Sequence, residues 1–282
     1  MIDRAAYNKL VKEVSAYWEP ISKPEMKWYE GCHQINLWTY WQGIDAEDVD
    51  ILVVGQDWGK PNWDDNITYK RNIKVDENIR RMNEGDLSVH YLDGVKPCAT
   101  DRNIAKLLTE LRAEDEQPLF PKVLEERYKN LFFTNFCLGY RRDKETGNLS
   151  KENMLKDSLY FKKLVEIVKP KIIICLGKMV FESVLYSLYK ETIVMTAREY
   201  WNLLNNKGTK CYRRSSAIND LEIIIYGMGH CGAFGVNINR KNFDKDQFPD
   251  DVGKKGMKLM QEDWNSINSD IKKLGIKPVS GI

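Results

Sequence analysis

The stretch "DILVVGQDWGKPNW", residues 50–63, carries an apolar run that ends in a glycine turn containing an acid. Ile51 to Val54 are all apolar, and Gly-Gln-Asp-Trp-Gly follows directly. Short, continuous apolar runs bounded by turn residues are typical of strands buried on both faces, as in a parallel sheet. We therefore predict a buried strand over residues 50–56 that ends by presenting the carboxylate of Asp57.

Other segments of the chain repeat this pattern. Similar apolar runs occupy residues 130–136, 171–177 and 221–227, and helical patterns occupy residues 101–114, 150–169 and 178–190. Ser150 is suited to cap the second of these helices, and Pro170 to end it. Strands that alternate with helices predict an α/β fold, here a three-layer αβα sandwich with a four-stranded parallel central sheet. We interpret the polar stretch 205–220 as a surface excursion.

The chain of 282 residues is expected to form a single domain. It would comprise an N-terminal helical extension (1–49), a core (50–241) and a C-terminal helix within 250–274. No apolar run approaches the roughly 20 residues of a membrane span, and the N-terminal residues are amphipathic with mixed charge, unlike a secretion signal. We expect a soluble, cytoplasmic protein that does not bind membranes.

Composition and motifs exclude several classes of site. The 6 cysteines form no C-x-x-C pair, which predicts free thiols in a reducing compartment and no structural metal. Neither a phosphate-binding P-loop nor a G-x-G-x-x-G fingerprint follows any predicted strand, so nucleotide triphosphatases and nicotinamide enzymes are disfavoured. The net charge of +2 does not by itself indicate a nucleic-acid partner.

Polar side chains follow each predicted strand. In a parallel sheet the ligand lies outside the carboxyl ends of the strands, and the residues expected there are Gln56, Asp57, Thr134, Asn135, Gly177, Lys178 and His230. Basic clusters at 69–74, 140–144 and 239–241 follow strands as well. Basic residues interleaved with aromatic residues suit phosphate contacts around a base pocket. Taken singly, Asp57 could cap a helix, His230 could be structural, and the basic clusters could be solvated surface.

These residues resemble motifs of the uracil-DNA glycosylase superfamily. "GQDWG" at 55–59 resembles its first motif, and "FFTNF" at 132–136 resembles the strand that carries its base-reading asparagine. Residues 134–181 are similar in order and spacing to a stretch of its iron-sulfur branch. The resemblance covers roughly residues 50–241. It implies a DNA base glycosylase, active in base excision repair, that flips uracil or a related deaminated base into a pocket and hydrolyses the N-glycosidic bond without a cofactor.

The resemblance also implies a role for each matching residue. Asp57 would position or activate water against C1′ of the flipped nucleotide, and Asn135 would read the Watson–Crick edge of the base. His230 would bond O2 of the base and stabilise the negative charge that builds there. The backbone at Gln56 would add a donor.

Further matches concern the base pocket and the DNA. Tyr69 would stack on the base, with Trp58 and Trp63 as rivals. Gly59 stands where the uracil-specific branch has a tyrosine that excludes thymine, so C5 of the base would be less tightly enclosed. The expected DNA contacts are Thr100, Arg141, Arg142 and Arg240, with Phe234 or Val236 as the wedge.

Two features separate the chain from the iron-sulfur branch and from other members. Cys32 has no cysteine three residues on and the later pair is missing, so we expect no iron-sulfur cluster. The second motif reads His230-Cys231-Gly232 in place of His-Pro-Ser. Two alternatives stay open: a non-catalytic nucleic-acid- or nucleoside-binding protein on the same fold, and hydrolysis or transfer at a free nucleoside or nucleotide.

Overall fold

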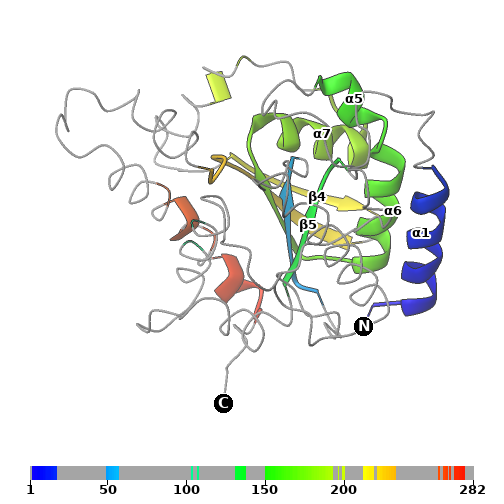
Figure 1. The fold of residues 1–282 in the computed structure, drawn as a ribbon. Coiled ribbons are helices and arrows are strands. Elements are labelled where there is room, and N and C mark those ends of the chain that lie inside the picture. Colours follow the sequence, from blue (N-terminus) through cyan, green and yellow to red (C-terminus); the bar gives the residue numbers. More distant parts are fainter. Residues whose placement is uncertain are drawn as a thin grey trace, which may run out of the picture.

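The described part of the chain is built around a five-stranded sheet (Figure 1). The computed structural model describes residues 2–17, 49–56, 103, 107, 131–137, 150–192, 196, 199–200, 212–218, 221–232, 260, 263–265, 267 and 270–276. The strand order in the sheet is β2-β1-β3-β5-β4.

Four of the strands are parallel, as the sequence predicts. They are β1 (Ile51–Gly55), β2 (Leu131–Asn135), β3 (Ile172–Leu176) and β5 (Leu221–Met228). Every residue of β1 and β3 is buried. Strands in the middle of a sheet covered on both faces need apolar side chains in both directions, which explains the continuous apolar runs. The α/β class is therefore confirmed.

The fifth strand corrects the prediction for residues 205–220. Residues Tyr212–Ile218 form β4, which pairs antiparallel with β5 at the edge of the sheet, from Tyr212 opposite Gly227 to Ile218 opposite Leu221. Interpreting this part of the stretch as a surface excursion was wrong. An edge strand pairs on one side alone and can carry a polar sequence such as "YRRSSAI". The signal that could have revealed it is the two-residue Asn-Asp connection to the next strand, the length of a tight hairpin.

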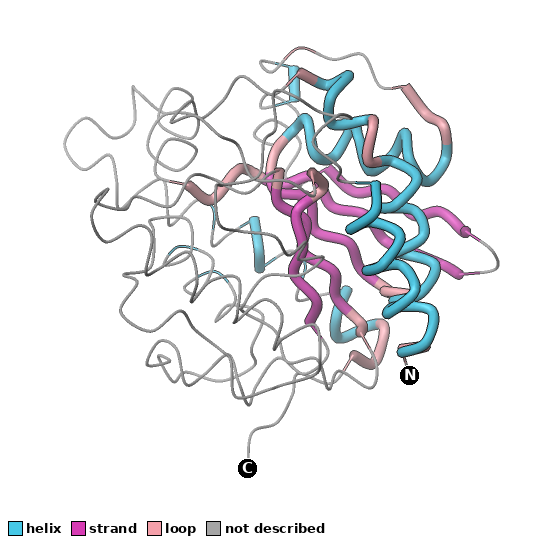
Figure 2. Tube along the Cα trace, turned by 45° about the vertical axis from the view of Figure 1, so that its right-hand side comes forward, coloured by secondary structure: helices cyan, strands magenta, loops and turns pink. Residues whose placement is uncertain are grey.

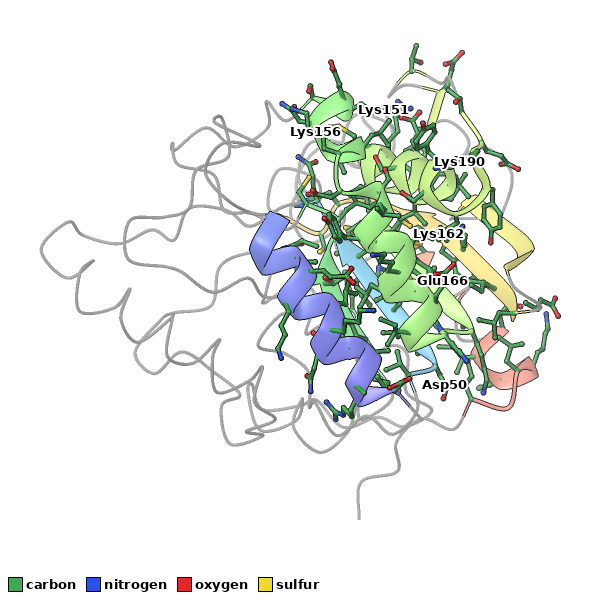
Figure 3. The ribbon with its side chains drawn as sticks, turned by 90° about the vertical axis from the view of Figure 1, so that its right-hand side faces the viewer. Asp50, Lys151, Lys156, Lys162, Glu166 and Lys190 are labelled. Atoms are coloured by element: carbon green, nitrogen blue, oxygen red, sulfur yellow. The ribbon has the colours of Figure 1, made fainter. Side chains whose placement is uncertain are left out.

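Helices line up on one face of the sheet. They are α1 (Arg4–Tyr17), α5 (Lys151–Leu155), α6 (Ser158–Val168) and α7 (Lys178–Tyr189). Figure 3 looks onto this layer, with α1 beside α6. One helix was expected over 150–169, but the helix is interrupted between α5 and α6. Ser150 caps α5 by accepting from the backbone N–H of Asn153 at 3.2 Å, as predicted.

Short helical pieces also lie on the opposite side of the sheet (Figure 2). A side chain added at Gly227 would meet Phe181 of α7, so this position of β5 faces the α7 layer. Its neighbour Tyr226 points the other way, because side chains alternate along a strand. There the Tyr226 hydroxyl bonds the carboxylate of Asp270, in the C-terminal helical segment. Trp264 and Ile271 of the same segment are buried.

Aromatic contacts join the helices to the sheet. Tyr7 of α1 meets Phe132 of β2 edge-on, with ring centroids 6.3 Å apart. Phe136, which follows β2, packs on Phe161 of α6 at 4.9 Å. Among the described helices, none is long and apolar enough to cross a membrane. Within the predicted helix 101–114, Asn103 and Leu107 are described, and both are helical.

Candidate functional site

The four parallel strands end together at one edge, which we call the carboxyl edge. Backbone hydrogen bonds continue between neighbouring strands just beyond their ends: the N–H of Cys137 donates to the carbonyl of Gln56 at 2.9 Å, and the N–H of Gly177 donates to the carbonyl of Met228 at 2.9 Å. The ends of β1 and β2, and of β3 and β5, are thus held level. Asp50 precedes β1 and therefore marks the other edge of the sheet, where the parallel strands begin. In Figure 3 it lies at the opposite end from Lys151.

The connections between strands change direction at one point along this edge. After β1 the chain continues to β2 on one side of it, whereas after β3, on the other side of β1, it continues to β4 and then to β5, both further out. Neighbouring strands whose continuations diverge mark the point where open α/β sheets bind ligands. Gln56 and Gly177 follow the two strands at this point.

Asn135 and His230 lie on either side of the point between β1 and β3 where the connections diverge. Asn135 ends β2 and His230 lies two residues beyond β5. Their strands are three spacings apart, about 14 Å at the usual strand separation. Two polar side chains at this separation can contact a flat ligand that lies between them. The structure thus brings Gln56, Asn135 and His230 to the same edge, as predicted.

Asn135 is buried and lies beside a glycine. The residue is 8% exposed, and it is paired in register with Gly55 of β1. Because Gly55 has no side chain, none projects from the neighbouring strand beside the Asn135 amide. A carboxamide offers both a donor and an acceptor from one group, which suits recognition of a base edge.

A backbone hydrogen bond sets the protonation pattern of His230. The N–H of Gly232 donates to Nδ1 of the ring at 3.0 Å. A ring nitrogen that accepts a hydrogen bond carries no proton, so the proton of the neutral imidazole is on Nε2. The ring therefore has a donor at Nε2, and its orientation is fixed by its own loop.

The loop that carries His230 is held at two carbonyls. The carbonyl of Met228 accepts from the Gly177 N–H and from the hydroxyl of Tyr200, the latter at 3.0 Å. The carbonyl of Cys231 accepts from Nδ2 of Asn103 at 2.8 Å. Asn103 and Tyr200 were not among the predicted site residues. The one local signal was that Asn103 lies three residues after Thr100, which is predicted to contact DNA.

Gly177 adopts a conformation that favours glycine. Its φ is 111° and its ψ is 157°, a combination essentially restricted to residues without Cβ. A Cβ added there would be 3.8 Å from Cβ of His230, an ordinary contact. Backbone conformation, and not lack of space, therefore explains the glycine, whose turn lets its N–H reach Met228.

Lys178, predicted at this edge, belongs to an ion-pair cluster. Its Nζ lies 2.9 Å from Oε1 of Glu182, and Nζ of Lys151 lies 3.3 Å from Oε2 of the same carboxylate. The Glu182 side chain is 4% exposed, and the two lysines are partly buried. A buried carboxylate requires such partners. The cluster joins α5 to α7 and explains Lys178 structurally.

The described cysteines are all buried. They are Cys137, Cys175 and Cys231, none of which takes part in a disulfide. Burial raises the pKa of the Cys175 thiol well above its usual value, so it stays protonated and unreactive at neutral pH. In the part of the chain that the structure describes, no group of three His, Cys, Asp or Glu residues could hold a metal ion.

Other predicted site residues lie outside the described residues, and their predictions stand untested. They are Asp57, Gly59, Tyr69, Thr100, Arg141, Arg142, Phe234 and Arg240. Asp57 directly follows Gln56, the last described residue of that segment.

No protein-family model and no curated protein matches the chain.

Proposed function

We propose that this protein is a DNA glycosylase of the uracil-DNA glycosylase type, which hydrolyses the N-glycosidic bond of uracil or a related deaminated base. The observation that carries the proposal is the placement of Asn135 and His230 at the carboxyl edge, on either side of the point between β1 and β3 where the connections diverge. His230 adds support because its Nε2 is the protonated nitrogen of the neutral ring.

Hydrolysis needs a donor where negative charge develops. As the bond between C1′ and the base breaks, its electron pair moves onto the base, and O2 becomes negative. The Nε2–H of His230 would donate to that oxygen and lower the barrier, as oxyanion donors do. Asp57 would orient the water that adds to C1′ and would take up its proton, while the departing base is protonated by solvent.

Recognition of the base would depend on Asn135 and Tyr69. The Asn135 amide can donate to O4 and accept from N3–H of uracil, a pattern that cytosine does not present. Tyr69 would stack on the ring. Flipping the nucleotide costs a few kcal/mol, least for a mispaired base, which favours deaminated positions.

The DNA partner would bind over the same edge of the sheet. Arg141, Arg142 and Arg240 would contact phosphates, Thr100 would contact the backbone beside the flipped nucleotide, and Phe234 would fill the space that the base vacates. Basic side chains around a base pocket can position the DNA through its phosphates, while the pocket itself recognises the base.

The test is release of uracil from a labelled oligonucleotide, followed by alkaline cleavage at the abasic site. Asp57→Asn and His230→Ala should each lower the single-turnover rate about 100- to 1000-fold, the range for loss of a positioned base or an oxyanion donor. His33→Ala is the matched control and should leave the rate unchanged. Absence of abasic sites in uracil, 5-hydroxymethyluracil and hypoxanthine substrates would refute the proposal.

A further inference from the structure

We infer that Asn103 and Tyr200 are positioning residues that hold the loop of His230 so that its Nε2–H faces the departing base. The chemical consequence rests on the proposed function. The geometry on which the inference is built, two hydrogen bonds to the carbonyls that flank His230, does not.

Asn103 acts on His230 through a single peptide group. The carbonyl of Cys231, which accepts from Asn103 at 2.8 Å, and the N–H of Gly232, which donates to His230 Nδ1 at 3.0 Å, belong to the same peptide unit. A peptide unit is planar, and in the trans form its C=O and N–H point in opposite directions. Fixing the carbonyl therefore fixes the direction of the N–H that keeps the proton on Nε2.

The same contact strengthens the bond to the ring. Hydrogen bonds in a chain polarise one another, so a donor at the Cys231 carbonyl makes the Gly232 N–H a better donor. Cys231 is fully buried, and a buried carbonyl gains more from such a partner than an exposed one. Asn103, from a part of the chain far from His230 in sequence, therefore stabilises one tautomer of the ring.

Tyr200 anchors the other side of the loop. Its hydroxyl donates to the Met228 carbonyl at 3.0 Å, and its ring is buried beside Phe181, with centroids 6.2 Å apart. Its backbone is held by reciprocal capping between Thr196 and Glu199, with the Thr196 N–H donating to the Glu199 carboxylate at 2.6 Å and the Glu199 N–H donating to the Thr196 hydroxyl at 3.1 Å.

Gly227 indicates that this hydroxyl contact is specific. A Cβ at Gly227 would lie 2.7 Å from the Tyr200 hydroxyl oxygen and 3.0 Å from Cγ of Phe181. The hydroxyl therefore passes directly over the backbone of Gly227 to reach the carbonyl of the next residue. A tyrosine that only filled the core would not require a strand glycine beneath its hydroxyl.

The experiment uses Asn103→Asp and Tyr200→Phe in the full chain. Asn103→Asp keeps the shape but replaces the donating nitrogen with an oxygen, and Tyr200→Phe removes the hydroxyl alone. The first readout is the ¹⁵N spectrum of the His230 ring, assigned by the signals that disappear in His230→Ala. We expect the single Nε2–H tautomer in the wild type and a mixture of tautomers in Asn103→Asp.

The second readout is the single-turnover rate of uracil release at saturating protein. Each variant should lose about threefold to tenfold, the factor for one hydrogen bond, with the concentration for half-maximal rate unchanged. Asn8→Asp, the same change on the exposed side of α1, is the control and should alter neither readout. If Asn103→Asp does not fold, the rate of Tyr200→Phe still tests the inference, because this variant loses the hydrogen bond to the Met228 carbonyl.

The outcomes separate the two proposals. If a folded Asn103→Asp keeps the wild-type ring spectrum, or if either folded variant keeps the wild-type rate in an active enzyme, the positioning role is wrong. If the wild type releases no base but the ring spectra change as expected, the proposed function fails, and the control of the His230 tautomer stands.

Discussion

Replacing Gly227 by alanine tests the packing that brings Tyr200 to the loop of His230. The added Cβ would approach the Tyr200 hydroxyl oxygen to 2.7 Å and two ring atoms of Phe181 to 3.0 and 3.1 Å. Both neighbours are fully buried, so they have little room to move. Gly227 is not among the described glycines with positive φ, and alanine can adopt its backbone conformation.

The expected cost follows from these contacts. Forcing a methyl group into a packed core costs about 1–3 kcal/mol, and displacing the Tyr200 hydroxyl from Met228 removes a hydrogen bond worth about 1 kcal/mol. Replacing glycine returns about 0.4–1 kcal/mol, since alanine restricts the unfolded chain. We predict a net loss of about 2 kcal/mol in the free energy of unfolding.

A double-mutant cycle identifies the hydroxyl as the cause. Tyr200→Phe removes the atom nearest to the new methyl group, so Gly227→Ala should cost about 1 kcal/mol less in that background. Urea unfolding followed by circular dichroism measures all four free energies, provided the urea slope is unchanged. Costs that add to within about 0.5 kcal/mol would refute the reasoning.

Gly275→Ala is the matched control for this cycle. Gly275 has a φ of 63°, and nothing lies within 4 Å of the position of an added Cβ. Its replacement should cost about 1–2 kcal/mol through backbone strain alone, with the same cost in the Tyr200→Phe background. If the cost of Gly275→Ala differed between the two backgrounds, the cycle would be reporting something other than the contact between the methyl group at position 227 and the hydroxyl of Tyr200.

Three further predictions concern the carboxyl edge and its surroundings. Gly177→Ala should cost about 1–3 kcal/mol in urea unfolding, because a φ of 111° is strained for any residue with a Cβ; an unchanged midpoint would contradict this. Arg141→Ala combined with Arg142→Ala should weaken DNA binding for every sequence and reduce the slope of log K against log salt by about 1–2. An unchanged slope would show that neither arginine contacts the DNA. Hydrogen bonds from the backbone and side chain of Thr196 lower the pKa of Glu199 from its ordinary value of 4.5, so its contribution to stability is complete above that value and is lost as the pH falls through the lowered pKa. The urea midpoint should therefore decline less steeply below pH 4.5 in Glu199→Gln, and a decline as steep as in the wild type would contradict the assignment.

Local pattern predicted the parallel strands well and the edge strand poorly. β1 and β3 are buried on both faces, so their sequences had to be continuously apolar, and a continuous apolar run can be recognised without knowing its neighbours. β4 pairs on one side, and its polar sequence does not differ from that of a loop. The interruption between α5 and α6 was missed because neither Gly nor Pro marks it.

The sequence by itself determined which residues follow the strands, and hence that Gln56, Asn135 and His230 share one edge, because parallel strands deliver their carboxyl ends to the same side. Only the tertiary structure decided how His230 is oriented. The side chains responsible, Asn103 and Tyr200, lie 128 and 28 positions from the carbonyls they hold. A hydrogen bond to a distant backbone carbonyl depends on the fold and not on the identity of the accepting residue, so it leaves no local pattern that a sequence could reveal.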